Sequence, residues 1–486
     1  MSEIVQIRRW AKLLDQTRCI GCHACSTACK SENGVPLGVH RTYVKAVEVG
    51  AFPAVRRAFQ VTRCNQCDAA PCTVACPTRA MYRRPDGIVD FDKAICIGCK
   101  ACIAACPYDA IFINPEDHSA EKCNLCSHRI DAGLEPACVT VCPTGAIVIG
   151  DLDDPSSEVA RAVQRGAVAV RRPEKETHPK VFYRGAHGAT LDPLAARRPA
   201  GGLYMWAEQP RGPHAVAAGH PERANASIAA LLAYDVAHRA PWDWRVSVYT
   251  WTKGISAGVY LVALALVALG EIDPAGALWR WIAPVTASAF LGLTGIVLIA
   301  DLEHPARFYL IFTRHHGRSW LVRGAFVIAA YGAVLAAHLA ASLAGGARAQ
   351  LWLGAAGGPL AAMTAIYTAF LFAQAKARDL WQSPLLPPHL VVQAAMLGSA
   401  ALLALEPVVR VPHAILSWAL AVAAAIHVAM VAGEVASTHA TAHARLAAHE
   451  LTSGRYARVF RLGLALSAAA IAAPWLPPWL SIAAPL

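Results

Sequence analysis

The sequence predicts two unlike halves: an α+β domain built around cysteine ligands, and an all-α polytopic bundle of seven to eight transmembrane helices. Three observations predict this class. All 16 cysteines lie between Cys19 and Cys142, long apolar runs fill the chain from residue 247 onward, and a segment rich in proline and glycine separates the two. The expected domains are therefore residues 1–185, a linker over 186–246 and a membrane domain over 247–486.

The N-terminus carries an Arg8-Arg9 pair but no apolar stretch behind it and no small-residue cleavage site. We therefore expect no secretory signal. In a reducing compartment thiols stay reduced, so the cysteines are expected to be metal ligands and not disulfides.

The cysteines form four quartets. The first and third have the spacing C-x2-C-x2-C-x3-C, which is the bacterial ferredoxin run, and the second and fourth lengthen the middle spacing. Three closely spaced thiolates can bind one cubane while the fourth points to another, so four quartets make two pairs of [4Fe-4S] sites. Zinc is the alternative, but zinc sites use two separated C-x2-C knuckles. The quartets are Cys19, Cys22, Cys25 and Cys29; Cys64, Cys67, Cys72 and Cys76; Cys96, Cys99, Cys102 and Cys106; and Cys123, Cys126, Cys138 and Cys142.

Seven apolar runs follow the linker, and each is close to the roughly 20 residues that a helix needs to cross a bilayer. The fifth is short and the last contains three prolines. Basic residues concentrate on the side of the cysteine-rich half, which predicts that this half faces the cytoplasm of a bacterial-type inner membrane. The runs cover residues 248–270, 282–300, 320–344, 351–375, 389–405, 413–433 and 459–480.

Residues 10–185 resemble the four-cluster electron-transfer subunit of molybdopterin oxidoreductases of the dimethyl-sulfoxide-reductase type, on stretches such as CIGCHACSTACKSENGVP and CIGCKACIAACPYDAI. The resemblance implies a double ferredoxin-like fold in which the first quartet pairs with the fourth and the second with the third. Because Cys99 is present where some relatives have tryptophan, all four clusters are expected to be cubanes. The implied ligand sets are Cys19, Cys22, Cys25 and Cys142; Cys123, Cys126, Cys138 and Cys29; Cys96, Cys99, Cys102 and Cys76; and Cys64, Cys67, Cys72 and Cys106.

The membrane half is similar to the polysulfide-reductase or NrfD-type anchor, on WTKGISAGVYL and DLEHPARFYLIFTRHHGRSWLVRGAF. Such anchors bind a quinone (menaquinone or ubiquinone) without haem. Ionisable groups at membrane depth are costly and usually functional. We expect a quinone site on the cytoplasmic side, with Tyr367 or His304 donating a hydrogen bond and Asp301 relaying a proton. Its candidate residues are Lys253, Asp301, His304, Arg307, Arg323, Tyr367 and Glu434.

Two alternatives stay open for these groups. Asp301, Arg307 and Arg323 could instead form a structural ion network. His338 and His427 lie within predicted spans and could ligate a haem, or form the proton path of an energy-coupling module in a larger respiratory assembly.

The sequence thus predicts a subunit that links a molybdopterin-containing catalytic partner to the membrane quinone pool and does not itself convert the soluble substrate. No nucleotide, flavin or pterin motif is found, and the sequence does not decide among sulfite, formate, polysulfide, tetrathionate and arsenate as the partner's substrate. The net charge of +11 does not indicate a nucleic-acid partner, because each oxidised cluster with four thiolates adds about −2.

Overall fold

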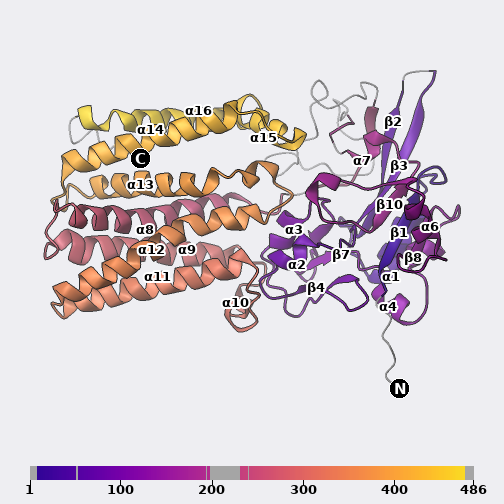
Figure 1. Cartoon of the computed structure of the whole chain (residues 1–486), viewed down its shortest axis with the longest axis horizontal. Helices are drawn as coiled ribbons and strands as arrows, with labels where there is room; N and C mark the ends of the chain where they lie inside the picture. Colours follow the sequence, from indigo (N-terminus) through magenta and orange to yellow (C-terminus); the bar gives the residue numbers. More distant parts are fainter. Residues whose placement is uncertain (1–7, 51–52, 193, 197–229, 239, 477–486) are drawn as a thin grey trace. The chain divides into compact units, whose positions relative to one another are not determined.

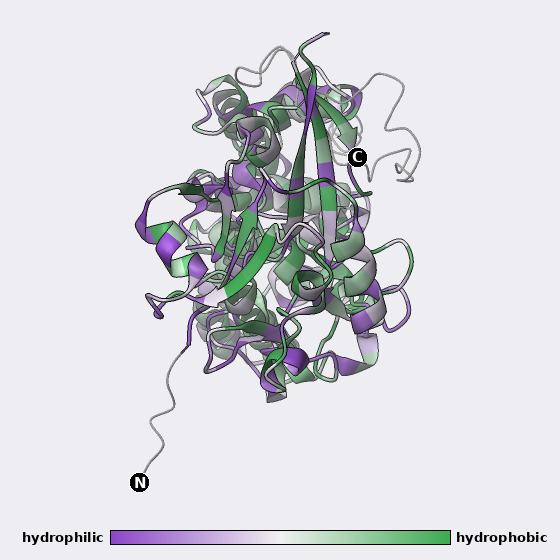
Figure 2. Cartoon of the chain, turned by 90° about the vertical axis from the view of Figure 1, so that its right-hand side faces the viewer, coloured by the Kyte–Doolittle hydropathy of each residue, from purple (hydrophilic) through white to green (hydrophobic). Residues whose placement is uncertain are grey.

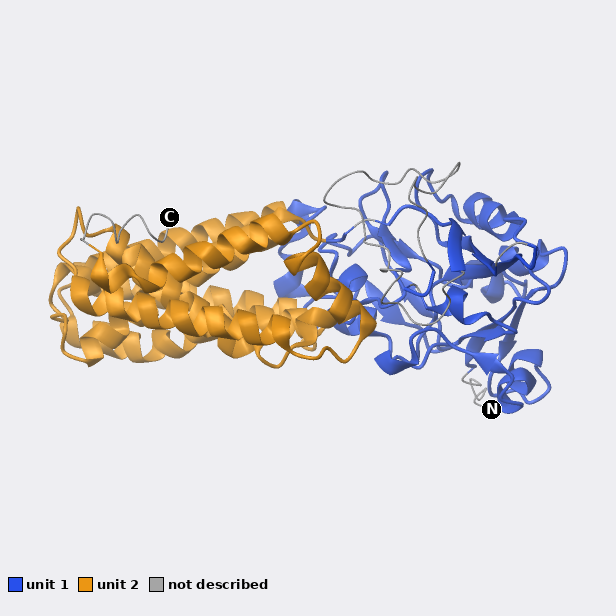
Figure 3. Ribbon diagram, turned by 90° about the horizontal axis from the view of Figure 1, so that it is seen from above, with its two compact units in different colours: residues 1–241, 302–316, 375–378 blue, residues 242–301, 317–374, 379–486 orange. Residues whose placement is uncertain are grey.

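The structure is a computed structural model that describes residues 8–50, 53–192, 194–196, 230–238 and 240–476. The chain divides into two compact units (Figures 1 and 3). Two short segments that lie between helices of the second unit belong to the first. The first unit is Met1–Pro241, Leu302–His316 and Ala375–Arg378, and the second is Trp242–Asp301, Gly317–Gln374 and Asp379–Leu486.

A four-stranded sheet in the order β8-β1-β10-β9 holds the two ends of the cysteine-rich sequence together. Strand β1 pairs parallel with β10 and antiparallel with β8. Helix α6 covers β1 with Val159, which packs against Leu13. The bounds are β1 Trp10–Asp15, β8 Ile147–Asp151, α6 Glu158–Gln164, β9 Val168–Ala169 and β10 Val181–Arg184.

A second sheet consists of the long hairpin β2 (Thr42–Val49) and β3 (Arg56–Arg63) with β11 (Ala230–Tyr234) on the outer edge of β2. Figure 2 shows hydrophilic and hydrophobic residues mixed along this hairpin. Strand β11 lies inside the segment expected to be a linker. Its Ala230 and Leu232 are buried against Val47, so this part of the segment is folded into the first unit. Residues 197–229 of the expected linker lie outside the described residues.

Short helices and two-stranded ribbons surround the cysteines. The ribbons β4-β5 and β6-β7 are antiparallel, and each of the helices α1 to α5 begins within or next to a cysteine quartet. The elements are α1 Ala24–Asn33, α2 Pro71–Ala75, β4 Met81–Arg83, β5 Val89–Phe91, α3 Ala101–Ala105, β6 Ile111–Ile113, β7 Ala120–Lys122, α4 Ser127–Asp131, α5 Ala137–Thr140, η1 Pro173–Lys175, α7 Gly188–Leu191, η3 Pro305–Arg307 and α10 Leu310–Thr313.

The second unit is a bundle of long helices (Figure 1). Within the described residues, six helices are long and apolar enough to cross a membrane. The helical elements are α8 Trp244–Ala268, η2 Leu278–Ile282, α9 Ala283–Ala300, α11 Trp320–Leu343, α12 Ala347–Ala373, η4 Asp379–Gln382, α13 Leu386–Ala404, α14 His413–Ala436, α15 Ala442–Thr452, α16 Ala457–Ile471 and η5 Ala473–Trp475.

Helix α8 packs against α9, α12 and α13. It approaches α13 backbone to backbone at two glycines: a Cβ on Gly258 would lie 1.9 Å from the carbonyl oxygen of Ala394, and one on Gly398 would lie 2.2 Å from the carbonyl carbon of Gly258. Small residues allow membrane helices to approach in this way, since van der Waals contact replaces the hydrophobic effect there.

The predicted class, an α+β domain followed by a transmembrane helix bundle, is confirmed. The first six apolar runs coincide with the six long helices. The seventh run forms α16, which has 15 residues and ends before Pro474. The rise of about 1.5 Å per residue makes such a helix shorter than the hydrocarbon core. The end of that run, from residue 477, lies outside the described residues.

Candidate functional site

The four cysteine quartets share one local backbone geometry. The residue before the second cysteine of each quartet has a positive φ: 69° at Gly21, 49° at Gln66, 68° at Gly98 and 61° at Leu125. This left-handed residue reverses the backbone between two cysteines, and a short helix then carries the third. The same turn occurs with glycine, glutamine and leucine at this position. This indicates that the required positions of the thiols determine the backbone conformation.

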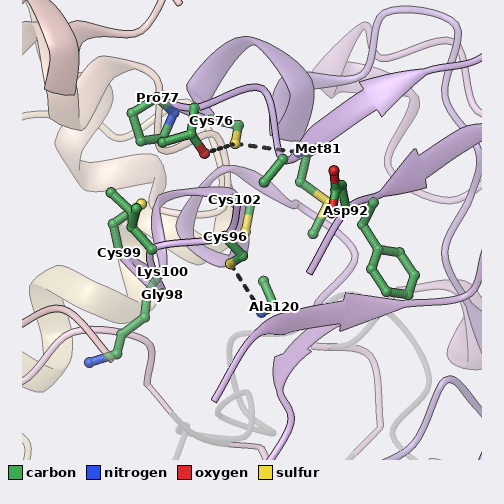
Figure 4. Close-up of a pocket in the computed structure, with 14 residues that line it drawn as sticks. Cys76, Pro77, Met81, Asp92, Cys96, Gly98, Cys99, Lys100, Cys102 and Ala120 are labelled. Carbon is green, nitrogen blue, oxygen red and sulfur yellow. Dashed lines mark hydrogen bonds between the residues drawn. The ribbon is translucent and has the colours of Figure 1, made fainter. Parts of the chain in front are cut away.

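The first pocket brings the third quartet together with one cysteine of the second. Cys96, Cys99 and Cys102 line it with Cys76 (Figure 4). Backbone N–H groups donate to two of these sulfurs: Met81 N lies 3.3 Å from Cys76 Sγ, and Ala120 N lies 3.4 Å from Cys96 Sγ. Donors of this kind are a known means of tuning thiolate-bound clusters.

A second pocket is lined by Cys19, Cys22, Cys25 and Cys142. The backbone N–H of Ala146 donates to Cys142 Sγ over 3.3 Å. Cys22 is exposed, whereas the second, third and fourth quartets are buried except for Cys142. Both pockets therefore join cysteines from the quartets that the resemblance pairs.

The remaining cysteines gather in two further groups. Burial, followed by the charges of Cys123, Cys138 and Cys126, raises the pKa of Cys29 to about 12. Burial, followed by Cys64 and then Cys106, raises the pKa of Cys67 to about 12, and Cys72 lies beside the same three thiols. Thiols crowded in this way lose their protons when bound cations compensate the charge, which fits the donor set of an iron–sulfur cluster.

Within the described residues, no three His, Cys, Asp or Glu side chains meet around a single point as they would around one metal ion. Eight of the cysteines instead line the two pockets described above, four in each.

Buried cations lie among the thiols, and sequence reasoning missed them. Lys12 Nζ and Arg63 Nη1 each lie 3.1 Å from Cys138 Sγ, and both side chains are almost fully buried. Burial raises the pKa of Cys138, but Lys12 and Arg63 outweigh it and bring the pKa to about 6. Lys122, also buried, acts in the same direction on Cys64. The first unit is thus built to hold negative charge at its centre.

The signal for these cations was present but ambiguous. Lys12 interrupts the apolar run of β1, and Arg63 ends β3 directly before Cys64. Successive side chains of a strand point to opposite faces of the sheet, so only the pairing of the strands shows that these two side chains point inward.

The expected quinone residues fall into separate places. Lys253 on α8 is buried; its Nζ donates to the carbonyl of Ala365 over 2.9 Å and to Thr368 Oγ1 over 2.5 Å, and it lies 4.7 Å from the centre of the Tyr367 ring. Tyr367 packs so closely on α11 that a Cβ on Gly324 would come within 2.3 Å of its ring.

The acidic candidates lie at helix ends. Asp301 follows α9 and has a carboxylate oxygen 3.7 Å from Arg245 Nη1. Glu434 lies near the end of α14, where it contacts the Ser383 side chain. Arg323 is exposed, and its Nε donates to the carbonyl of Gly317 over 2.8 Å.

His304 and Arg307 lie in the first unit, in the segment Leu302–His316. Arg307 Nη1 donates to the carbonyls of Lys93 and Cys96 over 3.0 and 2.9 Å. The His304 N–H donates to the carbonyl of Ile97 over 3.2 Å. The structure therefore groups these two residues with the third cysteine quartet.

The two histidines noted within spans have different partners. His338 Nδ1 lies 3.0 Å from the hydroxyl of Tyr260, in the core of the bundle. His427 Nδ1 lies 2.7 Å from His389 Nε2, across the contact between α13 and α14. His389 was not singled out from the sequence, because a lone histidine near a helix start gives no pattern.

Comparison with known families assigns both halves. The family model described as a 4Fe-4S dicluster domain matches residues 55–152, and the one described as polysulphide reductase, NrfD, matches residues 234–483. The protein belongs to the NrfD family.

Curated relatives match part of the chain. One subunit of the tetrathionate reductase of Salmonella typhimurium is 45% identical over 193 residues, which are 39% of this chain and 77% of the relative. One component of the polysulfide reductase of Wolinella succinogenes is 40% identical over 178 residues, 36% of this chain and 93% of the relative. The arsenate respiratory reductase iron-sulfur subunit ArrB of a Shewanella species is 36% identical in an alignment of 223 residues that covers 36% of this chain and 95% of the relative.

The expected fusion is thereby confirmed. The chain joins an iron–sulfur electron-transfer domain to a multi-pass NrfD membrane anchor.

Proposed function

We propose that this chain carries electrons between a molybdopterin-containing catalytic subunit and membrane quinone through four [4Fe-4S] clusters. The relatives that match its iron–sulfur half are named as components of tetrathionate, polysulfide and arsenate reductases. We assign the four clusters to the four ligand sets given above, since two of the sets line pockets and the other two are grouped thiols. When bound, each cluster accepts and releases one electron.

The observation that carries this proposal is the way in which two connections between membrane helices bond to one cysteine quartet. The segment Leu302–His316 follows α9 and binds the loop of Cys96 through Arg307. The segment Ala375–Arg378 follows α12, and its Ala377 N–H donates to the carbonyl of Ala104 in α3 over 3.2 Å. The site of Cys96, Cys99, Cys102 and Cys76 is therefore our candidate for electron exchange with the membrane half.

We assign the catalytic partner to the opposite end of the series of clusters, at the first quartet. Cys22 is the exposed thiol, and the neighbouring Ile20 is 59% exposed. Val141, beside Cys142, is also exposed. Apolar side chains around a solvent-accessible cluster site fit a surface that a protein partner covers, since electron transfer needs close approach.

For quinone we favour Lys253 and Tyr367 with Asp301. A buried ammonium and a phenol can both hydrogen-bond a quinone oxygen, and Asp301 can relay one of the two protons that accompany two electrons. The remaining four candidates make the separate contacts described for them in the candidate site: they are His304, Arg307, Arg323 and Glu434. The excess of basic residues on the helix connections that join the first unit supports a bacterial inner membrane with the iron–sulfur half in the cytoplasm.

A second candidate function, proton translocation through the bundle, is favoured by the His389–His427 hydrogen bond. A hydrogen bond between two imidazoles on neighbouring helices of the bundle is an arrangement suited to proton transfer. Unchanged proton release per electron in a His427→Gln variant would count against it.

The test of the leading proposal is purification of the complex from its native membrane. We expect a large subunit that contains molybdopterin to co-purify with the chain, and Asp301→Asn to slow quinol turnover while the clusters stay intact. Recovery of the chain alone, fully active with a soluble substrate, would contradict the proposal.

A further inference from the structure

The segment Leu302–His316 binds both parts of the sequence that supply the pocket of Figure 4. Arg307 reaches the loop of the third quartet, through the carbonyl of Cys96. His316 reaches the second quartet: its backbone N–H donates to the carbonyl of Pro77 over 2.9 Å, and its Nδ1 lies 3.1 Å from the carbonyl oxygen of Cys76. One segment thus ties together two ligand-bearing loops that are distant in sequence.

The fit of this segment is close. Gly98 lies between two cysteines of the loop, and a Cβ there would come within 2.3 Å of Glu303 Cβ. The carboxylate of Glu303 pairs with Lys100 over 3.0 Å, on the same loop. The backbone of His304 bonds Ile97. A glycine with φ of 68° is needed both for the turn and for this approach.

Arg307 differs from the other contacts because it brings a fixed positive charge. A guanidinium remains protonated at every physiological pH. Two carbonyls hold it, one of them that of the cysteine Cys96 itself. Reduction adds an electron to a cluster, so a cation at this position stabilises the reduced form more than the oxidised form.

We infer that Arg307 is a positioning residue that raises the reduction potential of the cluster held by Cys76, Cys96, Cys99 and Cys102. The inference rests on the proposed binding of a cluster by these four cysteines. Its consequence is that, at a given ambient potential, a larger fraction of this cluster is reduced than would be reduced without the guanidinium.

The test is a potentiometric titration of the full complex, followed by electron paramagnetic resonance. A Cys99→Ser variant first identifies the signal of the cluster concerned. In Arg307→Gln, we expect the reduced-to-oxidised ratio of that cluster at a fixed potential to fall about tenfold, which for a one-electron couple is a shift of about 59 mV to lower potential. The other three potentials should stay unchanged.

The matched control is Arg314→Gln, in the same segment. Arg314 is exposed, and its contact within the described residues is a backbone bond to Leu310. Arg307→Lys keeps the positive charge, so the reduction potential of this cluster should stay at its original value. This variant also keeps the inference testable if Arg307→Gln loses the cluster.

Three results would overturn the inference: an unchanged potential in Arg307→Gln with the cluster intact, an equal shift in Arg314→Gln, or a shift in Arg307→Lys as large as that in Arg307→Gln. Failure of the proposed function is distinguishable from all three. In that case Cys99→Ser would leave the iron content and every signal of the otherwise unaltered protein unchanged.

Discussion

A buried guanidinium, that of Arg63, lies among the cysteine thiols that we assign to the iron–sulfur clusters. Arg63 is 1% exposed, and the sulfur of Cys138 is its hydrogen-bond partner over 3.1 Å. Without the guanidinium, thiolates in an apolar interior would repel one another without compensation. Removal of one member of a buried charge arrangement commonly costs about 3–5 kcal/mol.

We therefore predict that Arg63→Gln lowers the iron content of the purified protein by about the amount of one cluster, four iron atoms. Iron analysis and the cluster absorbance measure this loss. Arg57→Gln is the control on the same strand, since Arg57 is more than half exposed and pairs with Glu48 at the surface. Equal iron content in both variants would contradict the role given to Arg63.

His238 supplies a prediction about pH. Burial lowers its pKa, but hydrogen bonds to Asp109 and Asp235 outweigh burial and raise the pKa to about 10. A histidine with a raised pKa stabilises the folded state fully below its unfolded value of about 6.5, and this stabilisation is lost as pH rises through about 10.

Thermal unfolding of the wild type and of His238→Gln should therefore differ most near pH 6, with the variant less stable by about 1–3 kcal/mol, and should converge toward pH 10. A difference that grows with pH would contradict the charged state assigned to His238.

At the scale of elements, the contact between α8 and α13 fixes the place of Lys253 in the bundle. Because Gly258 and Gly398 bring the two backbones together, a side chain at either position must separate the helices. The Lys253 ammonium bonds α12 on the other side of α8. A shift of α8 would therefore move it away from Ala365 and Thr368.

Gly258→Leu should lower the thermal stability of the detergent-solubilised protein by an amount typical of overpacking, about 1–3 kcal/mol or more, and should slow quinol turnover. Gly292→Leu on α9 is the control, since a Cβ at Gly292 meets no atom within 4 Å. If both variants unfold at the same temperature as the wild type, close packing at Gly258 is not what positions α8.

Much of the arrangement of cysteine quartets and long helices could be predicted from the sequence. The cysteine spacing identified all four quartets because three of the four thiols assigned to each cluster come from one stretch of the chain, and the apolar runs located six long helices. Strand β11 was missed because a short apolar stretch between prolines and glycines has no partner in the sequence itself. It becomes a strand only through its pairing with β2.

The candidate membrane site was less predictable, for a physical reason. A charged residue beside a span has the same appearance whether it binds a ligand, a neighbouring helix or another domain. Arg307 was grouped with the quinone residues, but it bonds the carbonyl of Cys96. Tyr367 and Lys253 lie beside one another, although α8 and α12 are far apart in sequence, and their role toward quinone stays a prediction.

At the scale of the whole molecule, the fusion places an iron–sulfur domain and an NrfD membrane anchor on one polypeptide. The two halves are then present in equal amounts. The connections Leu302–His316 and Ala375–Arg378 continue the chain from membrane helices and hydrogen-bond the region of the third quartet. Electron exchange between clusters and quinone is therefore the central property that we propose for the protein.

The most direct measurement follows reoxidation of the clusters by quinone. The full-length protein is placed in lipid vesicles, its clusters are reduced, and their absorbance is recorded after addition of a quinone under anaerobic conditions. Our account predicts rapid reoxidation in the wild type and at least about tenfold slower reoxidation in Lys253→Met with the same iron content, a loss of about 1.4 kcal/mol in transition-state stabilisation. Intact clusters that quinone does not oxidise in the wild type, or that it oxidises equally fast in both proteins, would contradict it.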